Sequence, residues 1–204
     1  LKCARYIESM KIFIRFVLVL AWIILSDSLQ SAEGARVISF HGFDDCIELN
    51  NKTARVVLCS AVGGRVLEFS IQGKNALWLN PDGVGKSNDT SAGRFDIGPE
   101  RILLQRNLLF RGPYKGEITG ARSAKLTSGA DPSSGFRIVR EFSLAAERPH
   151  LICKQTVINV SKETKQVCYW CRTFAQGQGI CVVPLSGFSR MPKKHVMYDD
   201  HLVI

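Results

Sequence analysis

Ten consecutive residues, 91–100, combine two glycines, a proline, an arginine and two carboxylates in one short stretch. The glycines permit backbone angles closed to other residues and the proline restricts the residue before it, so this stretch should follow a fixed, irregular path. Arg94 and Asp96 share a face if the piece between the glycines is extended, and Glu100 follows the bend. The stretch is either the rim of a small-molecule site or a loop whose charged side chains only pair with each other.

A second group of this kind lies 70 residues further along the chain. Trp170 and Arg172 belong to the alternating run 167–173, which places them on the same face of a strand. An aromatic ring can stack on the C–H face of a sugar while a guanidinium reaches its hydroxyl groups. The alternative is that Trp170 belongs to the core and that Arg172 makes an ordinary surface ion pair.

A third group, residues 190–200, contains three cations, a histidine, a tyrosine and two carboxylates. His195 is a weak candidate for a catalytic acid or base near neutral pH, because a single histidine is more often a plain surface residue. Tyr198 is expected at the edge of the site that the first two groups form.

Two further motifs suggest chemistry but fail on spacing. Gly85-Lys86-Ser87 ends like a phosphate-binding loop, yet Asn80 stands where that motif requires its first glycine. Cys168 and Cys171 have the spacing of half a zinc site, but alternation sends them to opposite faces of a strand. We expect these two thiols to be buried as small hydrophobic side chains, or one of them to be bridged to Cys181. No metal site and no cofactor are expected.

The beginning of the chain resembles a secretory signal peptide. Lys11 and Arg15 precede the apolar run 16–25, which is followed by a polar stretch and Ala32. The run is shorter than the roughly 20 apolar residues of a membrane span, so an uncleaved membrane anchor is the weaker alternative. Residues 1–32 are therefore predicted to be an N-terminal extension and signal peptide, with Met10 as the start and export to the periplasm or the exterior as the destination.

The predicted mature part, residues 33–204, is basic. Loss of residues 1–32 removes four basic and two acidic residues, which lowers the net charge from +9 to +7. The basic residues are scattered and the protein is expected to be exported, which excludes nucleic acid as a partner and leaves acidic polysaccharide. Contact with a membrane is expected only through the N-terminal segment before cleavage. Six cysteines remain, and their disulfide pairing stays open: Cys46, Cys59, Cys153, Cys168, Cys171 and Cys181.

The dominant hydrophobic period of the mature part is two. It predicts strands, separated by turn-forming clusters, at 54–58, 65–72, 118–126, 136–144, 151–160, 167–173 and 180–183. Only residues 100–109 could form a helical turn or two. The predicted fold is one all-β domain, an antiparallel β-sandwich over residues 33–204. The apolar end at 201–204 resembles the start of a further strand, so the domain is expected to be incomplete at its C-terminus.

Several motifs are similar to those of a known family. Residues 63–69 (GGRVLEF), 73–78 (GKNALW) and 92–100 (AGRFDIGPE) resemble the opening of galactose-mutarotase-like domains, especially secreted bacterial members of unknown function. Residues 170–174 and 184–198 resemble the later part of that group, so the resemblance covers most of residues 55–200. It implies a β-supersandwich whose concave face binds sugars.

The resemblance does not extend to mutarotase chemistry. Aldose 1-epimerases of this type act with paired histidines and a late glutamate, whereas His41 and His150 lie outside any matching motif and the glutamate would fall beyond Ile204. Three hypotheses therefore stand: an exported carbohydrate-binding domain, a carbohydrate-active enzyme of epimerase or lyase type, and a structural envelope protein without a ligand. The predicted partner is a carbohydrate, acidic ones included. The predicted substrate-binding residues are Arg94, Asp96, Glu100, Trp170, Arg172 and Tyr198.

The first testable prediction concerns export. When the whole chain is expressed with its own N-terminus, the exported protein should begin close to Glu33, because a charged start, a short apolar run and a polar exit direct cleavage there. N-terminal sequencing of exported material checks this. Material that still begins at Met10 would show that the segment acts as an anchor.

Overall fold

The chain folds into antiparallel β-sheets with almost no helix, as the sequence predicts. The computed structural model describes residues 33–101, 103, 106–180, 187, 193–198 and 201–203. Helical structure in these residues consists of one 3-10 turn, η1 (Pro81–Gly83), and one short helix, α2 (Asn107–Arg111). Neither of these described helices is long and apolar enough to cross a membrane.

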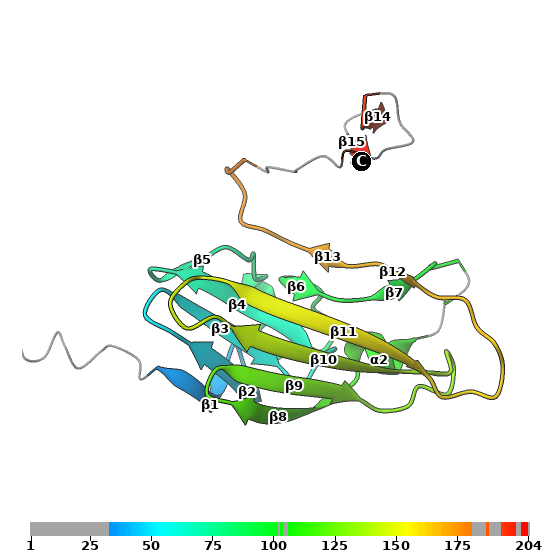
Figure 1. Cartoon of the computed structure of the whole chain (residues 1–204), viewed down its shortest axis with the longest axis horizontal. Coiled ribbons are helices and arrows are strands. Elements are labelled where there is room, and N and C mark those ends of the chain that lie inside the picture. The colour runs from blue at the N-terminus through cyan, green and yellow to red at the C-terminus, as the bar shows by residue number, and fades with distance from the viewer. Residues whose placement is uncertain are drawn as a thin grey trace, which may run out of the picture.

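The larger sheet has seven strands (Figure 1). Its main path runs, in spatial order, through β1 (Gly34–Phe40), β2 (Phe43–Asn50), β3 (Ala54–Cys59), β4 (Arg65–Ile71), β6 (Gly93–Arg94) and β13 (Arg172–Thr173). The seventh strand, β5 (Lys74–Asn75), pairs with β4 beside that path. The sheet thus joins the first half of the domain to a strand about 80 residues later in the sequence.

The smaller sheet has four strands in the order β11 (Leu151–Asn159), β10 (Phe136–Leu144), β9 (Ser123–Ser128) and β8 (Tyr114–Gly120). Two short ladders complete the described structure. In one, β7 (Ile97–Gly98) pairs with β12 (Cys168–Tyr169), and in the other, β14 (Val196–Tyr198) pairs with β15 (His201–Val203).

Several predicted strands differ from those observed. The run 118–126 is not one strand, because the chain turns after Gly120 and returns as β9. The run 167–173 is divided between β12 and β13, and 181–183 lies outside the described residues. Alternation missed β1, none of whose residues is fully buried. It also missed β2, which buries Glu48 among its apolar residues and so hides its period of two.

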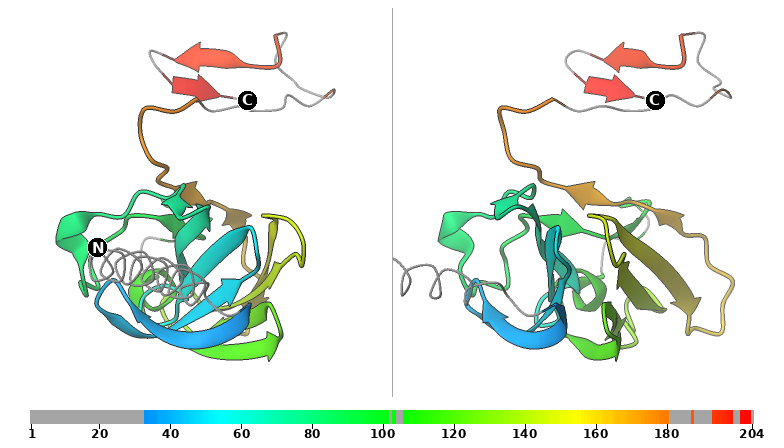
Figure 2. Two further views of the ribbon diagram at one scale, coloured as in Figure 1. Left: turned by 90° about the vertical axis from the view of Figure 1, so that its left-hand side faces the viewer. Right: turned by 60° about the vertical axis from the view of Figure 1, so that its left-hand side comes forward.

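A single hydrophobic core lies between the two curved sheets (Figure 2). Ile47 and Leu49 enter it from β2, and Ile138 and Phe142 enter it from β10, all with no more than 3% of their surface exposed. The alternation of β10 continues on its other face with exposed side chains such as Arg137 and Glu141. One face of each sheet therefore packs against the core. Burial of this apolar surface is the usual source of stability for packed antiparallel sheets.

Arg140 interrupts the apolar face of β10 and is fully buried. Its Nε donates to Gln155 Oε1 at 2.8 Å, its Nη2 donates to the Phe95 carbonyl at 2.6 Å, and its Nη1 donates to the Gly63 and Gly64 carbonyls. The guanidinium thus joins β10 to β11, to the turn between β3 and β4, and to the segment after β6.

The two glycines that Arg140 contacts must be glycines. Gly63 and Gly64 have φ values of 64° and 56°, in the left-handed region that disfavours other residues. A Cβ on Gly64 would lie 2.8 Å from Arg140 Nη1, and a Cβ on Gly63 would lie 2.4 Å from the Phe110 carbonyl oxygen. The Gly-Gly-Arg motif is therefore explained by close packing at this turn.

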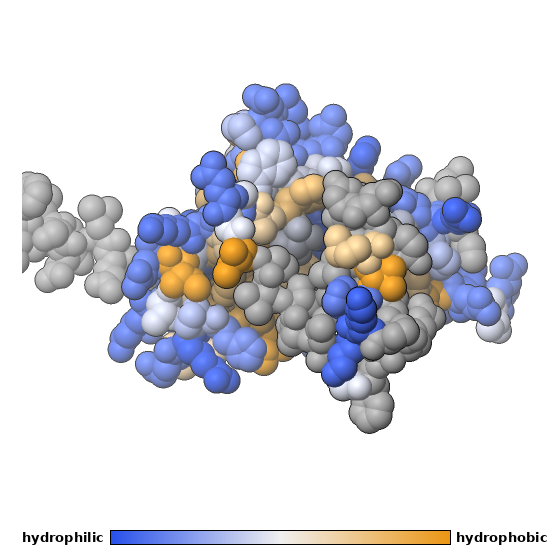
Figure 3. Space-filling view, turned by 90° about the horizontal axis from the view of Figure 1, so that it is seen from above, coloured by the Kyte–Doolittle hydropathy of each residue, from blue (hydrophilic) through white to orange (hydrophobic). Residues whose placement is uncertain are grey.

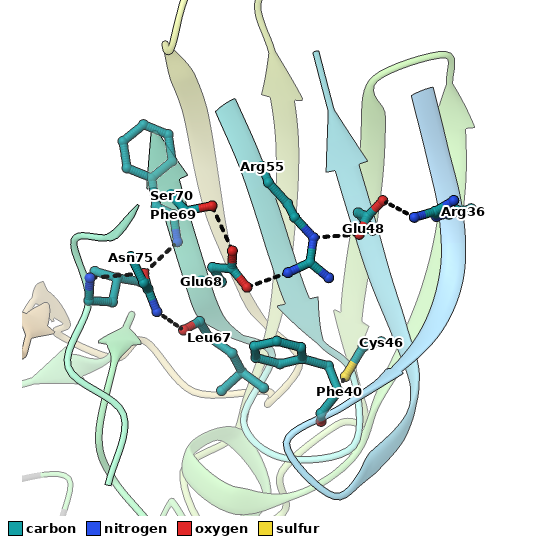
Figure 4. Close-up of polar contacts among 11 residues, drawn as sticks. Arg36, Phe40, Cys46, Glu48, Arg55, Leu67, Glu68, Phe69, Ser70 and Asn75 are labelled. Carbon is teal, nitrogen blue, oxygen red and sulfur yellow. Dashed lines mark hydrogen bonds and ion pairs between the residues drawn. The ribbon is translucent and has the colours of Figure 1, made fainter. Parts of the chain in front are cut away.

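A ladder of ion pairs crosses β1 to β4 on one face of the larger sheet (Figure 4). Glu48 binds Arg36 at 2.8 Å and Arg55 at 2.6 Å, and Arg55 continues to Glu68 at 2.5 Å. Ser70 donates a hydrogen bond to Glu68 at 2.6 Å. Because both carboxylates are bound by arginine, the ladder explains how two glutamates can be buried in a sheet.

Removal of the Arg140 side chain should destabilise the fold strongly. Arg140→Ala leaves the buried carbonyls of Gly63 and Gly64 and the part-buried carbonyl of Phe95 without their donor, and it creates a cavity. We therefore expect the free energy of unfolding to fall by about 3 kcal/mol or more. Arg137→Ala, at an exposed position of the same strand, is the matched control and should change it by less than about 0.5 kcal/mol. Urea unfolding measures both, and equal small effects would contradict the role of Arg140.

Candidate functional site

Five of the residues singled out in the sequence meet at the edge of the larger sheet. Arg94 in β6 lies directly opposite Arg172 in β13, so the two side chains project from the same face. Next to them, the backbone N–H of Trp170 donates to the carbonyl of Asp96 at 3.2 Å. We use the name arginine cluster for seven side chains that lie in this region: Arg65, Arg94, Asp96, Glu100, Arg106, Trp170 and Arg172.

Asp96 and Arg106 form the most regular contact of the arginine cluster. Arg106 Nε and Nη2 each donate to one oxygen of the Asp96 carboxylate at 2.9 Å, and the backbone N–H of Ile97 donates to the same group at 2.8 Å. Both side chains are buried. The hydrogen bonds that Arg106 donates to Asp96 raise the pKa of Arg106, and the negative charge of Asp96 adds to this, so that together they outweigh burial. A two-pronged, charge-assisted contact of this kind fixes the geometry of the loop.

Glu100 connects this buried pair to the surface. Its carboxylate lies 3.5 Å from Arg106 Nη2 and 3.5 Å from Arg172 Nη2. The guanidinium of Arg172 in turn lies 4.6 Å from the centre of the half-buried Trp170 ring. A groove of about 370 Å³, within the size range of ligand sites, is lined by Pro99, Glu100, Arg101 and Trp170.

Arg94 lies below this surface, and only 6% of the residue is exposed. Its guanidinium stacks on the Phe110 ring at 4.3 Å. Among the described residues, Nε and Nη1 of Arg94 have no hydrogen-bond partner. Burial, followed by the charge of Arg172, lowers the pKa of Arg94.

The loop before β6 is held by a second buried pair. Arg65 Nη1 donates to the Asp89 carbonyl at 2.9 Å and lies 3.4 Å from the Asp89 carboxylate, which also accepts from Ser91 Oγ at 2.7 Å. Burial alone would raise the pKa of Asp89, but the hydrogen bonds from Ser91 and the charge of Arg65 outweigh burial and lower it. These contacts fix the loop before β6 and therefore the position of Arg94.

The structure does not bring every predicted residue to the cluster. His195 and Tyr198 belong to the segment around β14, which stands apart from the two sheets in Figure 1. Arg65, Arg106 and Phe110 were missed, and the sequence offers little to find them. Arg106 lies ten residues after its partner Asp96 with no period linking the two, whereas Arg65 does belong to a motif that resembles a known family.

The prediction of buried thiols at positions 168 and 171 is wrong. Cys168 and Cys171 are exposed, because β12 and β13 are two-residue strands at sheet edges, where two layers do not enclose a side chain. The described cysteines, those two with Cys46, Cys59 and Cys153, are all free thiols. Cys181 lies outside the described residues.

On the side of the molecule seen in Figure 3, apolar residues lie in small separate groups among hydrophilic ones.

Within the part of the chain that the structure describes, no group of three or more His, Cys, Asp or Glu side chains could hold a metal ion. No protein-family model matches the sequence, and no curated protein or solved structure is significantly similar to it.

The contribution of Asp89 to stability should depend on pH. A carboxyl group whose pKa is lower in the folded state stabilises the fold above its unfolded value of about 3.9, and this contribution is lost as the pH falls through the folded-state pKa. We expect wild type to be more stable than Asp89→Asn at neutral pH and the difference to shrink in acid. Melting temperatures of both between about pH 6 and pH 2.5 check this. Asp82→Asn, at an exposed position, is the control and should follow wild type throughout.

Proposed function

We propose that this chain is an exported carbohydrate-binding domain of galactose-mutarotase-like type, with the arginine cluster and its groove as the binding surface. The observation that carries the proposal is the placement of Trp170 in the wall of the groove, with Arg172 stacked beside it. A ring of this kind offers a flat apolar face to a sugar, and the neighbouring guanidinium offers donors to its hydroxyl groups.

The arrangement of the carboxylates supports binding rather than catalysis. Asp96 already accepts hydrogen bonds from Arg106 and from the backbone, and Glu100 lies between two arginines. A general base needs an oxygen within hydrogen-bond reach of the substrate, and both oxygens of Asp96 are already occupied. Because the groove is lined by only a few polar groups around an aromatic ring, it has the composition of a site that orients a ligand.

Replacement of the Trp170 ring tests the proposal. If Trp170 stacks on the sugar, Trp170→Ala should weaken binding by roughly 1 kcal/mol, which is about fivefold in Kd. Because Trp170 is only half-buried, the loss of stability should stay below the about 3–5 kcal/mol of a core aromatic residue. Titration calorimetry with a panel of oligosaccharides and thermal unfolding measure the two effects.

Trp78→Ala is the matched control for this experiment. Trp78 is 40% exposed and packs beside Phe174, with a ring-centre distance of 6.2 Å, outside the arginine cluster. It should leave affinity unchanged. The proposal fails if wild type binds no member of the panel, or if Trp170→Ala costs the stability of a core residue without changing affinity.

A further inference from the structure

The buried charge of Arg94 is not balanced within the arginine cluster. A guanidinium carries five N–H donors, and those on Nε and Nη1 make no hydrogen bond to any described residue although they are shut off from solvent. A buried donor without an acceptor costs free energy, and a buried charge without a partner costs more. The stacking of Arg94 on Phe110 offsets only part of that cost.

The neighbouring carboxylates are already engaged with other arginines. Asp89 is bound to Arg65, and both oxygens of Asp96 accept from Arg106. Glu100 interacts with Arg106 and Arg172 at 3.5 Å each. The four guanidinium groups of the cluster therefore face three carboxylates, Asp96 and Glu100 of the cluster and the neighbouring Asp89. Among the described residues, Arg94 is the cluster arginine that makes no ion pair.

Arg172 brings a second positive charge beside the first. It lies opposite Arg94 across the β6–β13 ladder, and its side chain is 40% exposed. Its contact with the Glu100 carboxylate is long, at 3.5 Å. Two guanidinium groups on one face repel each other, and an anion bound to the exposed guanidinium of Arg172 would relieve that repulsion.

We propose that the carbohydrate bound here carries an acidic group, a carboxylate or a sulfate, which binds the partly exposed guanidinium of Arg172 beside the buried charge of Arg94 while the sugar ring stacks on Trp170. This inference rests on the proposed function and adds the chemical class of the ligand to it. The net positive charge of the chain would increase the rate at which such a ligand approaches.

The test uses matched pairs of oligosaccharides. Each uronic-acid oligosaccharide is compared with its carboxyl-reduced neutral form, and each sulfated one with its desulfated form, by titration calorimetry on the purified protein. Wild type should bind the acidic member of at least one pair about tenfold tighter or more, because charge-assisted hydrogen bonds are stronger than neutral ones. Added salt should reduce that preference. Whether the preferred member is carboxylated or sulfated identifies the acidic group.

Three variants distinguish recognition of the acidic group by these arginines from a general effect of the protein's positive charge. Arg172→Gln and Arg94→Gln should each reduce the preference for the acidic member about tenfold. Arg148→Gln removes the same charge at an exposed position of the loop between β10 and β11 and should leave the preference unchanged. If Arg94→Gln fails to fold, Arg172→Gln still decides the matter, because its side chain is partly exposed and fold and affinity can be measured separately.

The outcomes distinguish this inference from the function on which it rests. Equal affinity for both members of every pair, or an unchanged preference in Arg172→Gln, overturns the acidic ligand and leaves carbohydrate binding in place. Absence of binding to every member of the panel overturns both.

Discussion

The hydrogen bonds of Arg140 are the constraint on which the rest of the domain depends. Its side chain enters the core from the smaller sheet, where an apolar residue would be expected, and donates to the backbone of the larger sheet at Gly63, Gly64 and Phe95. A buried charge is tolerated when its donors are satisfied, and here carbonyl oxygens and a glutamine supply the acceptors. Since Phe95 separates Arg94 from Asp96, the same contact that holds the sheets together also fixes the candidate site.

Two buried ion pairs hold the candidate site in position within this fold. Asp89 and Arg65 hold the loop before β6, and Asp96 and Arg106 hold the loop after it, so both ends of the Arg94 strand are secured by buried contacts. A surface fixed before a ligand arrives loses less conformational entropy on binding. The rigidity of the arginine cluster therefore favours recognition of one ligand shape over adaptation to many.

Alternation along the sequence predicted β10 and β11 because one face of each is more buried than the other. It also predicted β3 and β4, although most of their residues are buried, because Glu68 and Ser70 alternate with apolar residues in β4. It failed for β2, where a glutamate is buried in an ion-pair ladder, and it could not find Arg140 or Arg106, since a buried arginine in a sequence is indistinguishable from a surface one. Ser91–Glu100 and Trp170–Arg172 were expected to line one groove, because glycine-rich bends beside polar groups favour a concave surface. The structure brings the two segments together, and Glu100 and Trp170 line the groove between them. The segment around His195 offered no such signal of its position.

The uneven pairing of charges in the cluster bears on how selectivity could arise. Where every arginine has its own carboxylate, an incoming anion must compete with an existing contact and gains little. Where one guanidinium is left over and a second lies beside it, a neutral ligand leaves the repulsion of Arg94 and Arg172 in place, whereas an anion removes it. Selectivity would then come as much from the unpaired donors of Arg94 as from the contacts made in the complex, because discrimination is a difference between two binding free energies. On this view, the burial of Arg94, which costs the unliganded fold free energy, is what would make the site discriminate between acidic and neutral sugars.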